Sequence, residues 1–157
     1  MLLQIGDIAP DFTLMAEESK QITLSKLRGK NVVLYFYPKD NTPGCTIEAC
    51  DFSSRKEQFE KLNAVVIGIS KDDIKSHYKF KNRYSLSFDL ASDPEGAICT
   101  KYGTFVEKSM FGKKYMGITR ATFLINAEGK ISYIWPDVSV LGHAKEVLAV
   151  IEKQQND

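Results

Sequence analysis

A buried strand that runs directly into a helix is the feature that most constrains this chain. Residues 32–37 read Val-Val-Leu-Tyr-Phe-Tyr, an apolar run without alternation, which is typical of a central strand covered on both faces. Thr42 and Pro43 are favoured at the N-cap and at the first helical position, respectively, so a helix is predicted to begin there. This junction favours an α/β fold, with a turn at the end of a central strand.

Cys45 lies at the start of this predicted helix. If Thr42 is the N-cap, Cys45 is the third helical residue, and its sulfur is close to backbone N–H groups and to the positive end of the helix. Such surroundings favour the thiolate, which is the reactive form of a cysteine. A second thiol, Cys50, follows on the same helix. A reactive cysteine with a second cysteine nearby predicts a redox enzyme.

Two simpler interpretations of these cysteines stay open. A free cysteine is most often a small buried apolar side chain. A zinc site is the other possibility, but Cys-x4-Cys is wider than the usual ligand pair, and His77 and His143 do not cluster with it. The cap signal, the strand and the second thiol together favour redox chemistry, without a metal, haem or flavin.

The composition is that of an ordinary globular domain. The 157 residues are predicted to form one domain, 1–157, because no linker or shift in composition divides them. The formal net charge is +1, from 21 basic and 20 acidic residues, so we expect neither nucleic acid nor membrane as a partner. We also expect a cytoplasmic location, because three cysteines are too few for a disulfide scaffold and no signal peptide or spanning apolar run is visible.

Hydrophobic periodicity and turn residues predict the order of the elements. Residues 127–130, Ala-Glu-Gly-Lys, are a strong hairpin signal. Residues 104–118 hold glycines among lysines and methionines and are predicted to be a loop or an excursion from the domain. The order predicts a mixed central sheet with helices on both faces and an N-terminal β-hairpin. The predicted strands are 11–14, 21–24, 31–37, 64–70, 88–91, 119–126 and 130–135. The predicted helices are 43–62, one that Asp72 or Asp73 caps and that runs to about Tyr84, a short one within 93–103, and 142–154.

Several of these motifs resemble those of the peroxiredoxin family. Pro38, Thr42 and Cys45 fit the pattern Pro-x-x-x-Thr-x-x-Cys, and Arg120 stands at the start of a later predicted strand. The string from Thr42 to Cys50, Thr-Pro-Gly-Cys-Thr-Ile-Glu-Ala-Cys, is similar to that of the bacterioferritin comigratory protein, or peroxiredoxin Q, branch. The resemblance covers nearly the whole chain and implies a thioredoxin-like fold.

The resemblance also implies a function, a thiol-dependent peroxidase that reduces hydrogen peroxide and organic hydroperoxides. Cys45 would attack the peroxide and become a sulfenic acid, and Cys50 would resolve it as an intramolecular Cys45–Cys50 disulfide. Thr42 and Arg120 would hold the peroxide, and Pro38 would limit water around the sulfur. Thioredoxin, or alternatively glutaredoxin, would reduce the disulfide. A monomer without a cofactor is implied as well.

Four other side chains receive weaker predictions. Glu48 resembles the acid that orients the arginine in this branch, although an exposed acid fits the sequence equally well. Cys99 lies in an apolar helical patch and is predicted to be buried, with resolution by Cys99 as the alternative. His77 and His143 have no carboxylate or cysteine beside them in the sequence, so we expect them at the surface.

Two other functions fit a thioredoxin-like chain. A thiol–disulfide oxidoreductase usually carries Cys-x-x-Cys at the helix start, whereas the third residue after Cys45 is Glu48. A binding or chaperone module would not call for Thr42 and Arg120, which packing alone does not require.

Helix geometry constrains how Cys45 and Cys50 could meet. On an intact helix, five residues give about 7.5 Å of rise and about 140° of rotation, which separates the Cα atoms by about 8.7 Å. A disulfide does not bridge more than about 7 Å. We therefore predict that the first turns of this helix unwind when Cys45 and Cys50 are joined.

Overall fold

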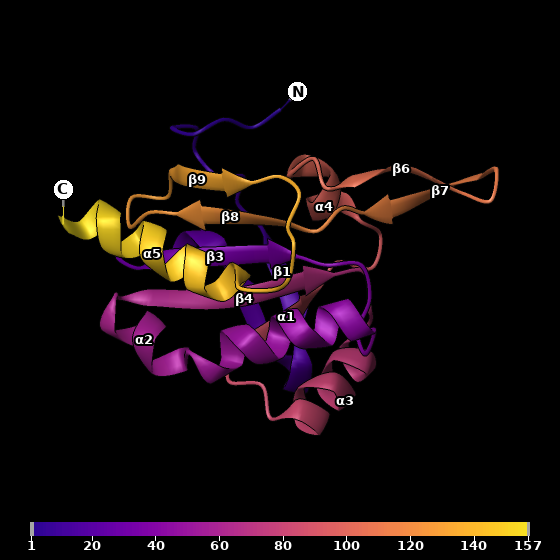
Figure 1. Ribbon diagram of the computed structural model, residues 1–157, viewed down its shortest axis with the longest axis horizontal. Coiled ribbons are helices and arrows are strands. Elements are labelled where there is room, and N and C mark those ends of the chain that lie inside the picture. Colours follow the sequence, from indigo (N-terminus) through magenta and orange to yellow (C-terminus); the bar gives the residue numbers. More distant parts are fainter. Residues whose placement is uncertain (1, 157) are drawn as a thin grey trace.

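The computed structural model describes residues 2–156 as a seven-stranded sheet flanked by helices, with a separate two-stranded arm (Figure 1). The three central strands β3, β4 and β5 are parallel, and the outer pairings are antiparallel, so the sheet is mixed, as predicted. In order across the sheet, the strands are β2 (Gln21–Thr23), β1 (Thr13–Ala16), β5 (Asp89–Ser92), β4 (Ala64–Ser70), β3 (Asn31–Phe36), β8 (Ala121–Ile125) and β9 (Ile131–Trp135).

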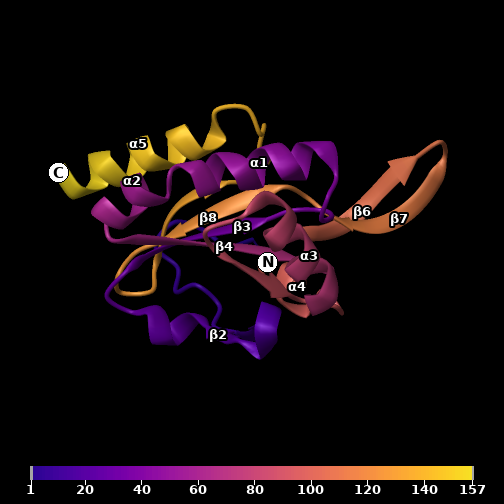
Figure 2. The same ribbon diagram turned by 90° about the horizontal axis from the view of Figure 1, so that it is seen from below.

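Helices cover both faces of this sheet. The longer helices α1 (Pro43–Ser54), α3 (Ile74–Tyr84) and α5 (His143–Asn156) pack on one core, together with the short α2 (Lys56–Lys61). The other core lies under α4 (Ala97–Lys101) and the N-terminal segment, which includes the short 3-10 helices η1 (Glu17–Ser19) and η2 (Leu24–Leu27). Figure 2 shows α1 and α5 on one side of the sheet and the segment around β2 on the other.

Successive side chains of β3 supply the two cores in turn. Val33 and Tyr35 point to the core beneath α1, whereas Val32, Leu34 and Phe36 belong to the core on the opposite face. This explains the unbroken apolar run in the sequence, because both faces of the strand are covered. The strand thereby holds the start of α1 at one end of the sheet.

The predicted helix over residues 43–62 is wrong in one respect, because it is two helices. The chain leaves helical geometry at Arg55, with φ −108° and ψ 20°, and α2 follows immediately. The prediction that Asp72 or Asp73 caps the next helix is confirmed for Asp73, since its side chain accepts a hydrogen bond from the backbone N–H of Ser76 at 2.8 Å.

For residues 104–118, predicted to be a loop or an excursion, the loop alternative is wrong. The segment forms an antiparallel hairpin of β6 (Phe105–Met110) and β7 (Lys113–Ile118), which projects from the body as an arm (Figures 1 and 2). Its two-residue turn holds Phe111 and Gly112, both with positive φ, which is the pattern of a type I′ turn. Asparagine is usual where Phe111 stands, so the sequence lacks the familiar hairpin signal.

The two histidines are buried, not at the surface as the sequence suggested. His77 is 0% exposed and hydrogen-bonds to Asp40, while the Nε2 atom of His143 lies 2.8 Å from the Thr122 hydroxyl. Burial lowers the pKa of His143 to about 4, although the nearby charge of Glu146 acts in the opposite direction. Both histidines find their partners on elements distant in the sequence, which is why the neighbours along the chain were uninformative.

No helix among residues 2–156 is both long and apolar enough to cross a membrane.

Candidate active site

The candidate site lies where β3 gives way to α1. The predicted helix start at Pro43 is confirmed, and Cys45 occupies the first turn of α1, only 1% exposed. The first backbone bond of the helix runs from Thr46 N–H to Thr42 C=O, at 2.9 Å. Cys45 is therefore held by the beginning of a formed helix, with its sulfur inside the protein.

Thr42 occupies the N-cap position, but its side chain does not cap the helix. Its backbone is extended, as expected of an N-cap residue, yet its hydroxyl donates to the carbonyl of Lys39 at 2.8 Å. The predicted N-cap position of Thr42 is thus confirmed, but without a hydrogen bond from the helix to its side chain. The hydroxyl instead tightens the turn before α1, and its oxygen keeps its capacity to accept a hydrogen bond.

Arg120 joins the thiol to a carboxylate. Its Nη2 lies 3.3 Å from Cys45 Sγ and its Nη1 lies 2.7 Å from Glu48 Oε1. The arginine directly precedes β8, which pairs with β3, so the sheet itself delivers the guanidinium to the start of α1. Gly44 leaves the room for it, since a Cβ there would lie 3.3 Å from Nη2.

Glu48 is buried, and only one of its two carboxyl oxygens has a hydrogen-bond partner. Its side chain is 1% exposed, and burial raises its pKa to about 7, although the Arg120 charge and hydrogen bond act in the opposite direction. Among the described residues, the buried side-chain oxygens and nitrogens without a hydrogen-bond partner are Glu48 Oε2 and Tyr35 Oη. Because one buried oxygen has no partner, burial raises the pKa of Glu48 although the carboxyl touches an arginine.

The three cysteines are all free thiols, and they occupy different environments. Cys50 is half-buried on α1, and burial raises its pKa. Cys99 is fully buried, as predicted, and burial, with the adjacent Asp93, raises its pKa far above the usual range. Cys45 belongs to the core beneath α1, and Cys99 to the core on the opposite face of the sheet. The sheet therefore separates Cys99 from Cys45.

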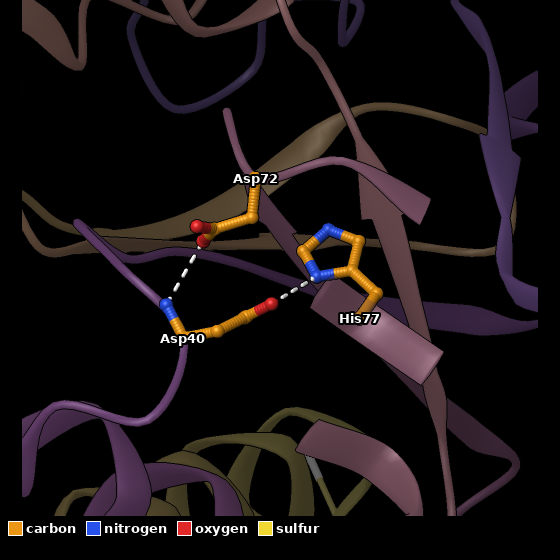
Figure 3. Close-up of side chains that lie close together, drawn as sticks. All are labelled: Asp40, Asp72 and His77. Carbon is orange, nitrogen blue, oxygen red and sulfur yellow. Dashed lines mark hydrogen bonds and ion pairs between the residues drawn. The ribbon is translucent and has the colours of Figure 1, made fainter. Parts of the chain in front are cut away.

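The described residues also contain one group of three side chains that could in principle hold a metal ion. Ligand atoms of Asp40, Asp72 and His77 lie within 4.8 Å of one another (Figure 3). They are already engaged: Asp72 accepts from the Asp40 N–H at 2.9 Å, and Asp40 Oδ2 lies 2.8 Å from His77 Nδ1. Without any ion, this group binds the loop before α1 to the start of α3.

Comparison with known proteins identifies the chain. The AhpC/TSA family profile matches residues 5–134. A relative from Coxiella burnetii whose name assigns it to the bcp peroxiredoxins is 52% identical over 148 residues, which are 94% of this chain and 98% of that protein. Peroxiredoxin Bcp of Bacillus subtilis is 45% identical, with 97% of each chain covered. The chain belongs to the peroxiredoxin family.

Solved structures agree with this assignment. A Xylella fastidiosa PrxQ variant superposes on the peroxiredoxin with a TM-score of 0.92 at 38% identity, over 99% of each chain. Bacterioferritin comigratory protein of Xanthomonas campestris gives a TM-score of 0.90 at 39% identity, over 97% of each chain. The expected thioredoxin-like fold and the expected bacterioferritin comigratory protein branch are confirmed. This peroxiredoxin is a peroxidase of the oxidoreductase class, which acts on a peroxide and needs a thiol reductant.

The structure brings together some of the predicted site residues and adds others. Cys45, Arg120 and Glu48 are in mutual contact through the guanidinium. Cys50 lies on the same helix as Cys45, and Thr42 closes the turn before it. Sequence reasoning missed the group around Asp40, since nothing near that residue in the chain indicates a buried aspartate.

Proposed function

We propose that this peroxiredoxin reduces hydrogen peroxide and organic hydroperoxides through the thiolate of Cys45. The observation that carries the proposal is the contact of Arg120 with both Cys45 Sγ and Glu48 Oε1. A guanidinium beside a sulfur stabilises the thiolate and keeps further N–H groups for a bound oxygen. The Xanthomonas campestris relative is described as having alkyl peroxide reduction activity, which supports the inclusion of organic hydroperoxides.

In the proposed first step, the Cys45 thiolate attacks the terminal oxygen of the peroxide. The S–O bond forms as the O–O bond breaks, and the other oxygen leaves as water or an alcohol after taking a proton. Negative charge spreads over sulfur and both oxygens in the transition state, so the fixed Arg120 cation lowers the barrier. We assign Thr42 to hold the peroxide, because its hydroxyl oxygen can accept a hydrogen bond from the peroxide O–H. We assign Pro38 to limit the access of water to the sulfur.

In the proposed second step, Cys50 attacks the sulfenic acid of Cys45. This forms the Cys45–Cys50 disulfide and releases water, and a dithiol protein, thioredoxin or alternatively glutaredoxin, then returns both thiols to the reduced state. Both cysteines belong to α1, so the helix must open locally before they can join. Cys99 is an unsuitable resolving thiol, because it faces the other core.

We further propose that the enzyme acts as a cytoplasmic monomer. One chain carries both thiols and the arginine beside Cys45, so no second subunit is needed to complete the site. A reducing compartment also supplies the dithiol reductant that the cycle consumes.

The test is to count thiols after a single oxidation. Reduced protein mixed with one equivalent of hydrogen peroxide, or of tert-butyl hydroperoxide, should lose two of its three thiols, and mass spectrometry should show a Cys45–Cys50 link. Cys50→Ser should instead accumulate a sulfenic acid on Cys45 that dimedone traps. A disulfide that contains Cys99, or no loss of thiol in either peroxide, would refute the proposed cycle.

A further inference from the structure

The loop before α1 is joined to the rest of the molecule through the buried residue Asp40. Asp40 accepts hydrogen bonds from the Tyr37 hydroxyl at 2.6 Å and the Ser76 hydroxyl at 2.8 Å, and its Oδ2 also lies 2.8 Å from His77 Nδ1. Its own backbone N–H donates to Asp72 Oδ2 at 2.9 Å (Figure 3). We call these five residues the loop clamp. The clamp connects the end of β3 to the segment after β4 and to α3.

A shared proton joins Asp40 to His77. The second ring nitrogen of His77, Nε2, lies 3.1 Å from the backbone carbonyl of Ala91, which can only accept, so Nε2 carries a hydrogen. Nδ1 and the carboxylate oxygen can then bond only if one more proton lies between them. The pair is either a carboxylate with an imidazolium or a carboxylic acid with a neutral imidazole, and its total charge is zero in both cases. A neutral pair is what burial of His77 and Asp40, 0% and 5% exposed, requires.

The shared proton explains the short distance between His77 Nδ1 and Asp40 Oδ2, so no metal ion is needed between them. Both oxygens of Asp40 already accept hydrogen bonds from hydroxyl groups, and Asp72 Oδ2 accepts from Ser70 and from the Asp40 N–H. A metal ion would have to displace the shared proton and disturb donors that are already satisfied. The three potential ligands therefore do not by themselves make a metal site.

We propose that His77 is a positioning residue for peroxide attack, acting through Asp40 to hold residues 38–42 in place. Asp40 lies midway between Pro38 and Thr42, the two residues of this loop to which the proposed function gives roles, and the inference rests on that function. The rest of the loop is held only locally: Thr42 donates to Lys39, and Asn41 has φ +62°, a conformation that asparagine tolerates. Without the clamp, nothing in these contacts would fix the loop relative to the sheet.

The clamp holds residues 38–40 of the site in place while the first turns of α1 can move. The Asp40 side chain bonds to Tyr37, Ser76 and His77, all outside α1. The first turns of α1 can therefore unwind for the disulfide while residues 38–40 stay attached to α3. The fixed loop then provides the end from which the helix re-forms after reduction.

The decisive experiment compares two reactions of Cys45 in variants of His77. His77→Leu removes the ring nitrogen that bonds to Asp40, whereas His77→Asn can place an amide N–H near the position of Nδ1. His77→Leu should slow stopped-flow oxidation by hydrogen peroxide by about tenfold or more, the scale of a misplaced reactive group. Alkylation of Cys45 by iodoacetamide needs access to the same sulfur but not the hydrogen bonds that align a peroxide, so its rate should change by less than about threefold. His77→Asn should restore most of the peroxide rate.

Controls make the result specific to the clamp. Tyr102→Phe deletes a 2.6 Å hydrogen bond to Pro10 in the other core and should destabilise the protein without changing the peroxide rate. Ser76→Ala, a milder change, should slow oxidation by a smaller factor and serves if His77→Leu does not fold. An unchanged peroxide rate in His77→Leu, an equal loss in both Cys45 reactions, or stoichiometric metal in the purified protein would overturn the inference. Wild-type protein that does not react with peroxide would instead refute the proposed function.

Discussion

The contact of Arg120 with the sulfur of Cys45 is what makes this buried cysteine a candidate reaction centre. It is the last residue before β8, and strand pairing with β3 carries it to the start of α1. Burial tends to lower the pKa of Arg120, but the charges of Glu48 and Cys45 outweigh this and raise it. The guanidinium therefore stays charged beside the sulfur, with both neighbours stabilising its position.

Replacement of Arg120 should slow the chemical step specifically. Arg120→Ala should reduce the second-order rate of Cys45 oxidation by roughly a hundredfold or more, the scale of losing one transition-state donor. Arg120→Lys should recover only part of this loss, because lysine cannot contact Glu48 and Cys45 through two separate nitrogens. Stopped-flow oxidation with hydrogen peroxide measures both variants. A rate in Arg120→Ala equal to that of the wild type would make Arg120 a purely structural partner of Glu48.

Glu48 should leave a signature in the pH dependence of stability. Its pKa is raised to about 7 from 4.5, so the folded protein keeps a proton that the unfolded chain releases as the pH rises between these values. The stabilising contribution is complete below pH 4.5 and is lost as the pH passes through 7. Glu48→Gln cannot ionise, so it should gain up to roughly 3 kcal/mol relative to the wild type across this range. Urea unfolding at several pH values tests this, and a difference independent of pH would contradict it.

At the scale of elements, α1 holds two thiols that its own geometry keeps apart. The structure, with free thiols, shows the helix formed from Pro43, as predicted for the reduced state. Oxidation should therefore increase amide hydrogen exchange in residues 43–54 by at least about tenfold, while exchange in α5 stays unchanged. Equal protection of residues 43–54 in the two states, with a proven Cys45–Cys50 disulfide, would show that the helix does not open.

The β6–β7 arm carries a local conflict that a substitution should relieve. Phe111 is 97% exposed and has φ +52°, so it has neither packing nor a favourable backbone conformation. Phe111→Asn should stabilise the arm by about 0.5–1 kcal/mol and slow amide exchange in β6 and β7 by roughly two- to fivefold. Phe111→Leu keeps the conflict and is the matched control. Faster exchange in Phe111→Asn would mean that the aromatic ring itself supports the turn.

Across the whole molecule, the sequence predicted what depends on local pattern. The unbroken apolar runs gave β3 and β4, and Thr42 with Pro43 gave the start of α1. Contacts between distant segments were not visible in the same way. His77 is buried against Asp40, which lies 37 residues away in the chain. The arm forms although Phe111 stands where asparagine usually marks such a turn.

The site itself was partly predictable for a related reason. Cys45 was predicted from its place at a helix start and Arg120 from the resemblance to the peroxiredoxins, and the structure places Cys45 Sγ 3.3 Å from Arg120 Nη2. The loop clamp was missed because Asp40, Ser76 and His77 resemble ordinary surface residues in the sequence. Only the fold brings the three together in a buried position.

The most direct test of the account is the reaction of Cys45 itself with peroxide. Reduced wild-type protein and Cys45→Ser should be mixed with hydrogen peroxide and followed by stopped flow, and by turnover with thioredoxin as reductant. The wild type should oxidise in a second-order reaction and turn over, whereas Cys45→Ser should show neither, since a serine hydroxyl is not ionised at neutral pH. Turnover by Cys45→Ser above a few per cent of the wild-type rate would contradict the assignment of Cys45 as the reacting thiol.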